Sequence, residues 1–291
     1  MKTRILSVYN QKGGVGKSTV SVNVGAALAL MLSHETPASG YPERVLVVDL
    51  DQQINSEVTL SGGFFGERNY KGLLGPWDNI AGLLMMQTDK SATEIIQTAG
   101  IPRGAKQNLD FIPSSKEKML LVDPELQAHP EDGLFRLREL LESLASFYSY
   151  VIIDNPPGLS HRSISSLIAA THVVIPCQLE AGSIDGLTDA IRTIQGIQRR
   201  QNQGLELVGI LPTMCDFRIQ EQNEFYAQLQ QEYRRLMLPP IYRRADVTVA
   251  NSQGLDIFSF KPSRQSGGMV SSSPATQDFA QASEEIRRRM D

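Results

Sequence analysis

The apolar residues of this chain gather into six short runs, each followed by a longer segment of mixed polarity. The runs are rich in Val and Ile and do not alternate with polar residues, which is typical of strands buried on both faces of a parallel sheet. We therefore predict strands at residues 5–9, 44–50, 109–112, 150–153, 173–177 and 207–211.

Segments with helical character lie between these runs and after the last one, at residues 20–30, 130–147, 184–201, 220–236 and 277–291. Strands that alternate with helices indicate a doubly wound α/β fold: a mostly parallel sheet is flanked by helices, and the carboxyl ends of the strands share one edge. We expect surface helices and loops at 60–108, a mobile loop at 259–276, and one domain over 1–291.

Composition narrows the class of protein. Of the 291 residues, 41% are hydrophobic and 21% are charged, as in globular rather than disordered proteins. No apolar stretch reaches the roughly 18 residues of a membrane span, and the first strand begins too early to leave room for a signal peptide, so we expect a cytoplasmic protein. Cys177 and Cys215 lack metal-ligand spacing, which favours reduced core thiols over a disulfide or a zinc site.

The segment NQKGGVGKST at residues 10–19 is the most specific motif of the chain. It connects a predicted strand to a predicted helix, which is the context of a phosphate-binding loop whose backbone N–H groups surround phosphates. In this pattern Lys17 contacts the β- and γ-phosphates and the Ser18 hydroxyl binds Mg²⁺. Gln11 stands where the usual pattern begins with Gly, and Lys12 is an additional cation. The loop predicts a nucleoside-triphosphate site with one lysine more than the ordinary version.

Three aspartates follow predicted strands and would meet a ligand at the carboxyl edge of the sheet. Asp154 follows the run at 150–153, and we expect its carboxylate to hold Mg²⁺ directly or through water. Asp49 and Asp51 are two residues apart on an extended segment and therefore face the same side. One of them could support the metal while the other orients the attacking water. Because phosphoryl transfer depends mainly on positioning and charge neutralisation, this set is sufficient for a triphosphatase.

These motifs together resemble the deviant-Walker ATPases of the ParA/Soj partition family, relatives of MinD. The segments that carry the resemblance are 12–19, 49–56 and 150–158, with weaker similarity at 108–114, 175–180 and 211–218. The resemblance spans about residues 3–260 and implies a P-loop fold with ATP and Mg²⁺ as cofactors.

The family resemblance also implies roles for individual residues. Lys12 would reach across a nucleotide-sandwich homodimer to the phosphates bound by the other subunit, Lys17 would bind phosphate, and Asp51 would position the water. Metal binding falls to Ser18, Asp49 and Asp154. The implied nucleotide contacts are Lys12, Gly13, Gly14, Val15, Gly16, Lys17, Ser18, Thr19, Met214 and Asp216.

Proteins of this family turn over slowly and act as switches. The resemblance implies that ATP-bound dimers coat non-specific DNA, and that a ParB-like or cargo-adaptor partner stimulates hydrolysis and release. We therefore expect association with the nucleoid in the ATP-bound state and no membrane partner. The cargo could be a plasmid, a chromosome or a large protein assembly.

The chain departs from the family pattern at several positions. Gln52 replaces the usual Pro and Asn155 the usual Thr, and neither change removes a predicted ligand. Residues 241–250 differ from the family's Ile-Pro-Arg start and Glu-Ala end. Because the phosphate loop begins almost at Met1, we expect no helix-turn-helix extension and no sequence-specific operator binding.

A segment in the C-terminal part of the chain carries a local excess of positive charge that is compatible with a DNA-binding surface. The whole chain has a net charge of −4, yet residues 190–264 contain ten Lys or Arg and seven Asp or Glu, an excess of three positive charges. Arg218, Arg243 and Arg244 are the candidate DNA contacts, and a solvated charged face is the alternative.

Other functions share this fold. A MinD-like membrane switch would need an amphipathic anchor, which the Arg-rich C-terminal segment does not supply. An electron-transferring iron protein would need cluster cysteines at a dimer axis, and the two isolated cysteines of this chain argue against it. An ATP-dependent small-molecule synthetase is compatible with the phosphate loop, as is a binding module without ATP turnover.

Overall fold

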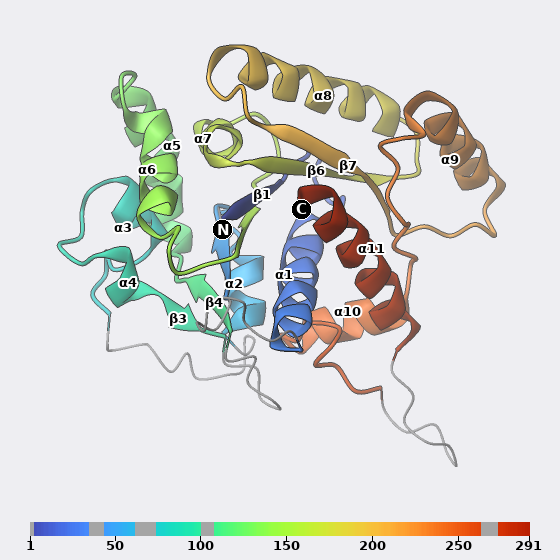
Figure 1. Ribbon diagram of the computed structural model, residues 1–291, viewed down its shortest axis with the longest axis horizontal. Helices are drawn as coiled ribbons and strands as arrows, with labels where there is room; N and C mark the ends of the chain where they lie inside the picture. Colours follow the sequence, from blue (N-terminus) through green and yellow to red (C-terminus); the bar gives the residue numbers. More distant parts are fainter. Residues whose placement is uncertain (1–2, 35–43, 62–73, 100–107, 263–272) are drawn as a thin grey trace.

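The computed structural model of the protein describes residues 3–34, 44–61, 74–99, 108–262 and 273–291 (Figure 1). Its centre is a seven-stranded sheet with the order β3-β4-β2-β5-β1-β6-β7. All neighbouring strands are parallel except the short edge strand β3, which is antiparallel to β4. The strands are β1 (Arg4–Val8), β2 (Val45–Asp49), β3 (Gln97–Thr98), β4 (Leu109–Ile112), β5 (Tyr150–Asp154), β6 (His172–Gln178) and β7 (Glu206–Thr213).

Helices cover both faces of the sheet (Figure 1). Helices α1, α2, α10 and α11 pack on the face that carries Leu6 and Val47, and α3 to α9 pack on the face that carries Ile5 and Val48. Because successive strand residues point to opposite faces, both faces need apolar side chains, which explains the runs without alternation. The helices are α1 (Lys17–Ser33), α2 (Asn55–Leu60), α3 (Ile80–Leu84), α4 (Ala92–Ile95), α5 (Lys116–Ala128), α6 (Arg136–Ser143), α7 (His161–Ala169), α8 (Ser183–Arg200), α9 (Gln220–Tyr233), α10 (Ala245–Ser252) and α11 (Pro274–Met290), with a 3₁₀ turn, η1 (Gly133–Phe135).

The doubly wound, mostly parallel sheet predicted from the sequence is confirmed. The six predicted strands are β1, β2, β4, β5, β6 and β7, with ends that differ by at most two residues. Four predicted helices correspond to α1, α8, α9 and α11, and the segment 130–147 is divided into η1 and the shorter α6. Helix α11 begins earlier than expected because the Ser273 hydroxyl accepts a hydrogen bond from Ala275 N and Pro274 occupies the first position.

The region at 60–108 differs from the expectation of surface helices and loops. The longest described part of it, 74–99, contains α3, α4 and β3, and Ile80, Leu84 and Ile95 are completely or almost completely buried. An added Cβ at Gly82 would meet the Trp77 carbonyl oxygen at 1.8 Å, so the chain is tightly folded there. Most of the predicted mobile loop at 259–276 lies outside the described residues.

Among the described helices, none is long and apolar enough to cross a membrane.

Candidate nucleotide-binding site

The phosphate loop connects β1 to α1 through two glycines in the left-handed region. Gly14 has a φ of 77° and Gly16 a φ of 84°, conformations that favour glycine over any residue with a Cβ. Gly16 is the N-cap of α1, and no side chain in the described part of the chain caps this helix. The first-turn N–H groups and the positive end of the helix dipole are thus directed at the loop, as an anion site requires.

Lys17 is buried inside the loop. Its Nζ donates a hydrogen bond to the Lys12 carbonyl oxygen over 2.9 Å, and the residue is only 6% exposed. Burial lowers the pKa of Lys17, and the nearby carboxylates of Asp154 and Asp51 oppose this effect. Lys17 is therefore positioned to exchange a carbonyl oxygen for phosphate oxygens, and its phosphate contact stays a prediction.

Lys12 has a different environment. Its Nζ lies 2.9 Å from Oε1 of Glu180, in the segment between β6 and α8, and 3.5 Å from the hydroxyl of Ser183, the first residue of α8. Its backbone N–H donates to Asn10 Oδ1 over 2.9 Å, which orients the start of the loop. In this single chain the side chain of Lys12 is held by its own subunit, so its predicted reach across a dimer stays a prediction.

Asp154 is a buried carboxylate at the end of β5. Its Oδ2 accepts a hydrogen bond from the Ser56 hydroxyl over 2.7 Å, and its Oδ1 accepts one from Ser21 over 3.2 Å. Burial raises the pKa of Asp154 to about 6, a shift that a hydrogen bond from Ser18 opposes. A cation beside Asp154 and Ser18 would relieve the cost of this buried charge.

The carboxylate of Asp49 holds the segment that follows β2. Its Oδ1 accepts from Asp51 N and its Oδ2 from Ser56 N, both over 2.9 Å. Burial raises the pKa of Asp49 well above its usual range. The predicted metal ligation by Asp49 stays a prediction, and the second lone pair of Oδ1 is the one available for it.

Asp51 lies at the start of this segment and is 8% exposed. Its Oδ1 accepts from Gln53 N over 3.0 Å, which leaves Oδ2 available to orient water. Within the described residues there is no group of three or more His, Cys, Asp or Glu that could hold a metal. Mg²⁺ bound here would need phosphate and water oxygens beside Ser18 and Asp154.

A cavity of about 270 Å³ opens beside the loop. It extends from Gly16 and Thr19 to Met214, whose φ is 52°, and to the exposed Tyr242. Met214 lies next to the loop, because Gln178 Nε2 contacts both its sulfur, over 3.2 Å, and the Gly14 carbonyl oxygen. Its predicted contact with a nucleotide stays a prediction. The further lining residues are Val20, Thr213, Ile241, Arg243, Arg244, Val247, Thr248, Asn251 and Phe279.

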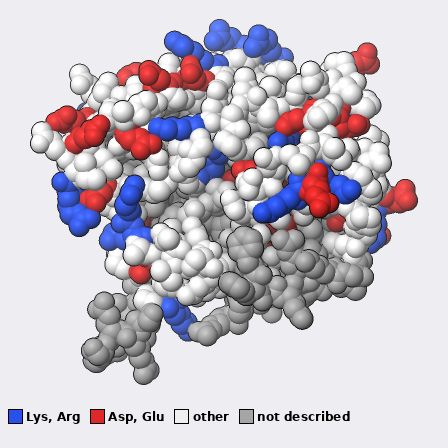
Figure 2. Space-filling model, turned by 180° about the vertical axis from the view of Figure 1, so that it is seen from behind, with Lys and Arg blue, Asp and Glu red and all other residues white. Residues whose placement is uncertain are grey.

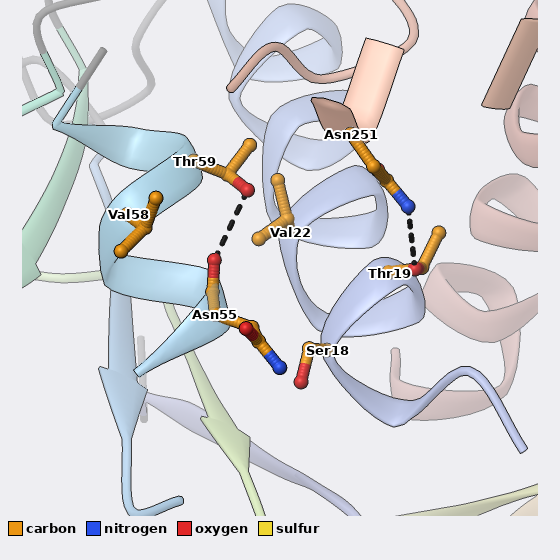
Figure 3. A pocket seen from close by; sticks show the side chains of 7 residues that line it. All are labelled: Ser18, Thr19, Val22, Asn55, Val58, Thr59 and Asn251. Carbon is orange, nitrogen blue, oxygen red and sulfur yellow. Dashed lines mark hydrogen bonds between the residues drawn. The ribbon is translucent and has the colours of Figure 1, made fainter. Parts of the chain in front are cut away.

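A second cavity of about 230 Å³ lies between α1, α2 and α10 (Figure 3). Its lining includes Ser18 and Asn55, and the amide of Asn55 points toward the Ser18 hydroxyl in Figure 3. Asn251 of α10 donates to the Thr19 hydroxyl over 3.1 Å and borders both cavities. Sequence reasoning missed Asn55 and Asn251, and only the family-like segment 49–56 contained a signal for the first.

The predicted contact Asp216 does not line either cavity. It forms a bidentate pair with Arg218, with distances of 2.8 and 2.7 Å, and this contact lowers the pKa of Asp216 to about 2. The Arg218 side chain is 90% exposed. Arg218 thus carries a compensated charge at the surface.

The other two candidate DNA contacts border the 270 Å³ cavity. Arg244 pairs with Asp278 over 2.9 Å and lies 5.2 Å from the centre of the Tyr242 ring, whereas Arg243 is exposed. On the face shown in Figure 2, basic side chains form small groups interspersed with acidic ones. DNA binding by these arginines stays a prediction.

The glycine-rich loop between β1 and α1, with buried aspartates at the ends of β2 and β5, defines a P-loop nucleoside-triphosphate-binding protein. A family model described as an AAA domain matches residues 3–207. The sporulation initiation inhibitor protein Soj of Bacillus subtilis is 31% identical over 261 residues, which cover 89% of this chain and 92% of Soj. The chain belongs to the ParA/Soj family of P-loop ATPases, within the ParA/MinD superfamily.

Solved structures share the fold. The McdA–ATP complex from Cyanothece has a TM-score of 0.75 at 18% identity, and the match covers 99% of this chain and 96% of that one. Cobyrinic acid a,c-diamide synthase from Mycobacterium smegmatis, with bound ADP and magnesium, has a TM-score of 0.67 at 26% identity, with coverage of 86% and 91%. These matches agree with the sheet and the P-loop described above.

Proposed function

We propose that the protein is an ATP-dependent dimerising switch that positions or segregates a cargo. In this proposal it hydrolyses ATP to ADP and phosphate, binds DNA without sequence preference, and responds to a ParB-like or cargo-adaptor partner. The observation that carries the proposal is a phosphate loop with a buried and a surface lysine, beside the buried Asp51 and Asp154. Membership of the ParA/Soj family supports the positioning role.

The chemistry follows from the environments of these residues. The loop N–H groups and Lys17 would bind the phosphates of ATP, and Ser18 and Asp154 would hold Mg²⁺, which neutralises phosphate charge when bound. Asp51 would orient the water that attacks the γ-phosphorus, while the bond to the bridging oxygen breaks and ADP leaves. No covalent nucleophile is required.

The 270 Å³ cavity is the proposed site of the base and ribose. It adjoins Gly16 and Thr19 at the start of α1, so a nucleotide with its phosphates in the loop would extend into it. Met214, Val247 and Phe279 supply apolar surface for a flat ring, as small-molecule sites commonly do.

The test is product analysis with ATP and Mg²⁺ and no other substrate. We expect slow formation of ADP and phosphate in equal amounts by the wild type, and loss of ATP binding in Lys17→Ala. Lys90→Ala is the control, because Lys90 pairs with Asp78 away from the loop. Absence of turnover with DNA and a ParB-like or cargo-adaptor partner present would favour a binding module.

The similarity to cobyrinic acid a,c-diamide synthase supports a second candidate, an ATP-dependent synthetase. Such an enzyme uses ATP to activate a carboxylate, so its ADP formation depends on a carboxylic acid substrate. ATP hydrolysis at the same rate with and without carboxylic acids would exclude this candidate.

DNA binding is tested separately. We expect ATP-dependent binding to arbitrary duplex DNA that weakens with salt, and a lower affinity for Arg243→Glu and Arg218→Glu. Arg192→Glu makes the same charge change on the exposed face of α8, where Arg192 pairs with Asp189, and serves as the control. Equal affinities for all three variants and the wild type would remove these arginines from the DNA surface.

A further inference from the structure

Arg162, the second residue of α7, is a buried arginine that the proposed reaction does not use. It is 7% exposed, and its side chain reaches from α7 to the end of β2. There its Nη1 donates to the Leu50 carbonyl oxygen over 2.9 Å. This carbonyl belongs to the peptide bond between Leu50 and Asp51.

A single acidic residue of α5 fixes Arg162 in place. Asp123 accepts from the Arg162 backbone N–H and from its Nε, both over 2.9 Å, and lies 2.8 Å from its Nη2. The planar guanidinium can satisfy a carboxylate and a carbonyl at once because its donors are arranged as a rigid fork. The Arg162 side chain is 8% exposed and that of Asp123 27%, so solvent screens this pair only partly.

Leu50 is held through both of its backbone polar groups, which belong to the two consecutive peptide bonds on either side of its Cα. Its N–H donates to the Asp154 carbonyl oxygen over 3.0 Å, and its carbonyl accepts from Arg162. The next residue is Asp51. Its backbone N–H belongs to the same peptide bond as the Leu50 carbonyl and donates to Oδ1 of Asp49. Arg162 therefore holds the carbonyl end of the Leu50–Asp51 peptide and Asp49 holds its N–H end, and the direction of the Asp51 side chain depends on this peptide plane.

We propose that Arg162 is a positioning residue for hydrolysis: it holds the Leu50–Asp51 peptide so that the Asp51 carboxylate meets the attacking water. The inference rests on the proposed ATPase function. Through Arg162, both α7 and α5 are connected to the segment that carries Asp51, so both helices would affect the hydrolytic step. ATP binding depends on the phosphate loop instead, and Arg162 does not touch it in the described contacts.

The test compares Arg162→Met with Arg136→Met. Arg136 is a matched control, because its side chain is 9% exposed and it contacts both a carboxylate, Asp132, and a backbone carbonyl, that of Leu84. For Arg162→Met we expect unchanged ATP affinity and ATP-dependent dimerisation, with kcat reduced about tenfold or more, since a small misplacement of a catalytic group has effects of this order. Arg136→Met should keep the kcat of the wild type.

A double-mutant cycle separates positioning from a general structural role. If Arg162 acts through Asp51, the pair Arg162→Met and Asp51→Ala hydrolyses no more slowly than Asp51→Ala alone. Additive losses, or an unchanged kcat in Arg162→Met, would overturn the inference while the wild-type ATPase activity stands. Wild-type protein without turnover would overturn the proposed function, and this inference with it.

Hydrogen exchange provides a readout that does not depend on activity. The backbone N–H groups of Gln53 and Ile54 donate to the side chain and to the carbonyl oxygen of Asp51, respectively. In the ligand-free protein, these two amides should lose protection from exchange in Arg162→Met but not in Arg136→Met. Arg162→Lys keeps the positive charge but replaces the forked guanidinium with a single ammonium, and it serves as the test if Arg162→Met does not fold. Its kcat should lie between those of the wild type and Arg162→Met. Wild-type protection and kcat in Arg162→Lys would contradict a role for the bidentate geometry.

Discussion

Lys12 and Lys17 are five residues apart in one loop, yet their surroundings differ in kind. Lys17 is buried and its ammonium contacts a carbonyl of the loop, whereas Lys12 is a surface residue paired with Glu180. In the proposed dimer, the buried Lys17 would therefore stay within the site of its own subunit. Lys12 can leave Glu180 at little cost, since exposed pairs are worth roughly 0–1 kcal/mol.

At the residue scale, Asp51→Ala should bind ATP and dimerise but hydrolyse poorly. We expect kcat to fall about a hundredfold, the size of a typical contribution from a group that orients or deprotonates water. Asp51→Asn is the control for local structure, because an amide oxygen can still accept from Gln53 N. The measurements are single-turnover hydrolysis and ATP titration, and normal turnover in Asp51→Ala would refute the assigned role.

At the scale of helices and strands, the local sequence pattern predicted most of the fold, but it did not predict contacts between residues that are far apart in the sequence. The strands and the phosphate loop could be predicted because each depends on a run of adjacent residues. Helix α5 was missed because Pro124 and many polar residues interrupt its pattern. Asn251 and Arg162 reach the site from α10 and α7, and only the folded chain brings them there.

Gly25 shows how closely α1 packs on the sheet. A Cβ at this position would lie 3.0 Å from Val47 Cγ2, whereas one at Gly186 of α8 would have no described heavy atom within 4 Å. Gly25→Leu should therefore lower the free energy of unfolding by about 1–3 kcal/mol through overpacking. Gly186→Leu should leave it equal or higher, because leucine favours helices more than glycine does. Urea denaturation distinguishes the two, and equal effects would contradict the packing argument.

His172, the first residue of β6, gives the fold a dependence on pH. Burial lowers the pKa of His172 below the value of about 6.5 expected in the unfolded chain. Below pH of about 6.5 the unfolded chain binds the proton more readily, so this residue makes the free energy of unfolding decrease as pH falls toward the native pKa. His172→Gln should lose less stability than the wild type between pH 7.5 and 5.5 in urea denaturation. An equal loss of stability in His172→Gln and the wild type would contradict this contribution of His172.

At the scale of the whole molecule, DNA binding depends on how charge is distributed. On the face shown in Figure 2, basic and acidic side chains are interspersed and no single patch dominates that face. Arg218 and Arg244 each have an acidic partner in the same chain, Asp216 and Asp278. Phosphate groups would have to compete with these carboxylates. DNA binding by one subunit is therefore expected to be weak, and a dimer that doubles the number of contacts would bind more tightly.

Dimerisation itself depends on Lys12 in the proposed switch. Lys12→Ala should keep ATP binding through Lys17 and the loop N–H groups, but lose the ATP-dependent dimer, because no cation then reaches the partner's phosphates. Glu180→Gln is the matched control: it removes the present partner of Lys12, leaves the lysine in place, and should still dimerise with ATP. Size-exclusion chromatography with light scattering, with and without ATP, measures both variants. An ATP-dependent dimer of Lys12→Ala as stable as that of the wild type would show that the second lysine is not what couples nucleotide to assembly.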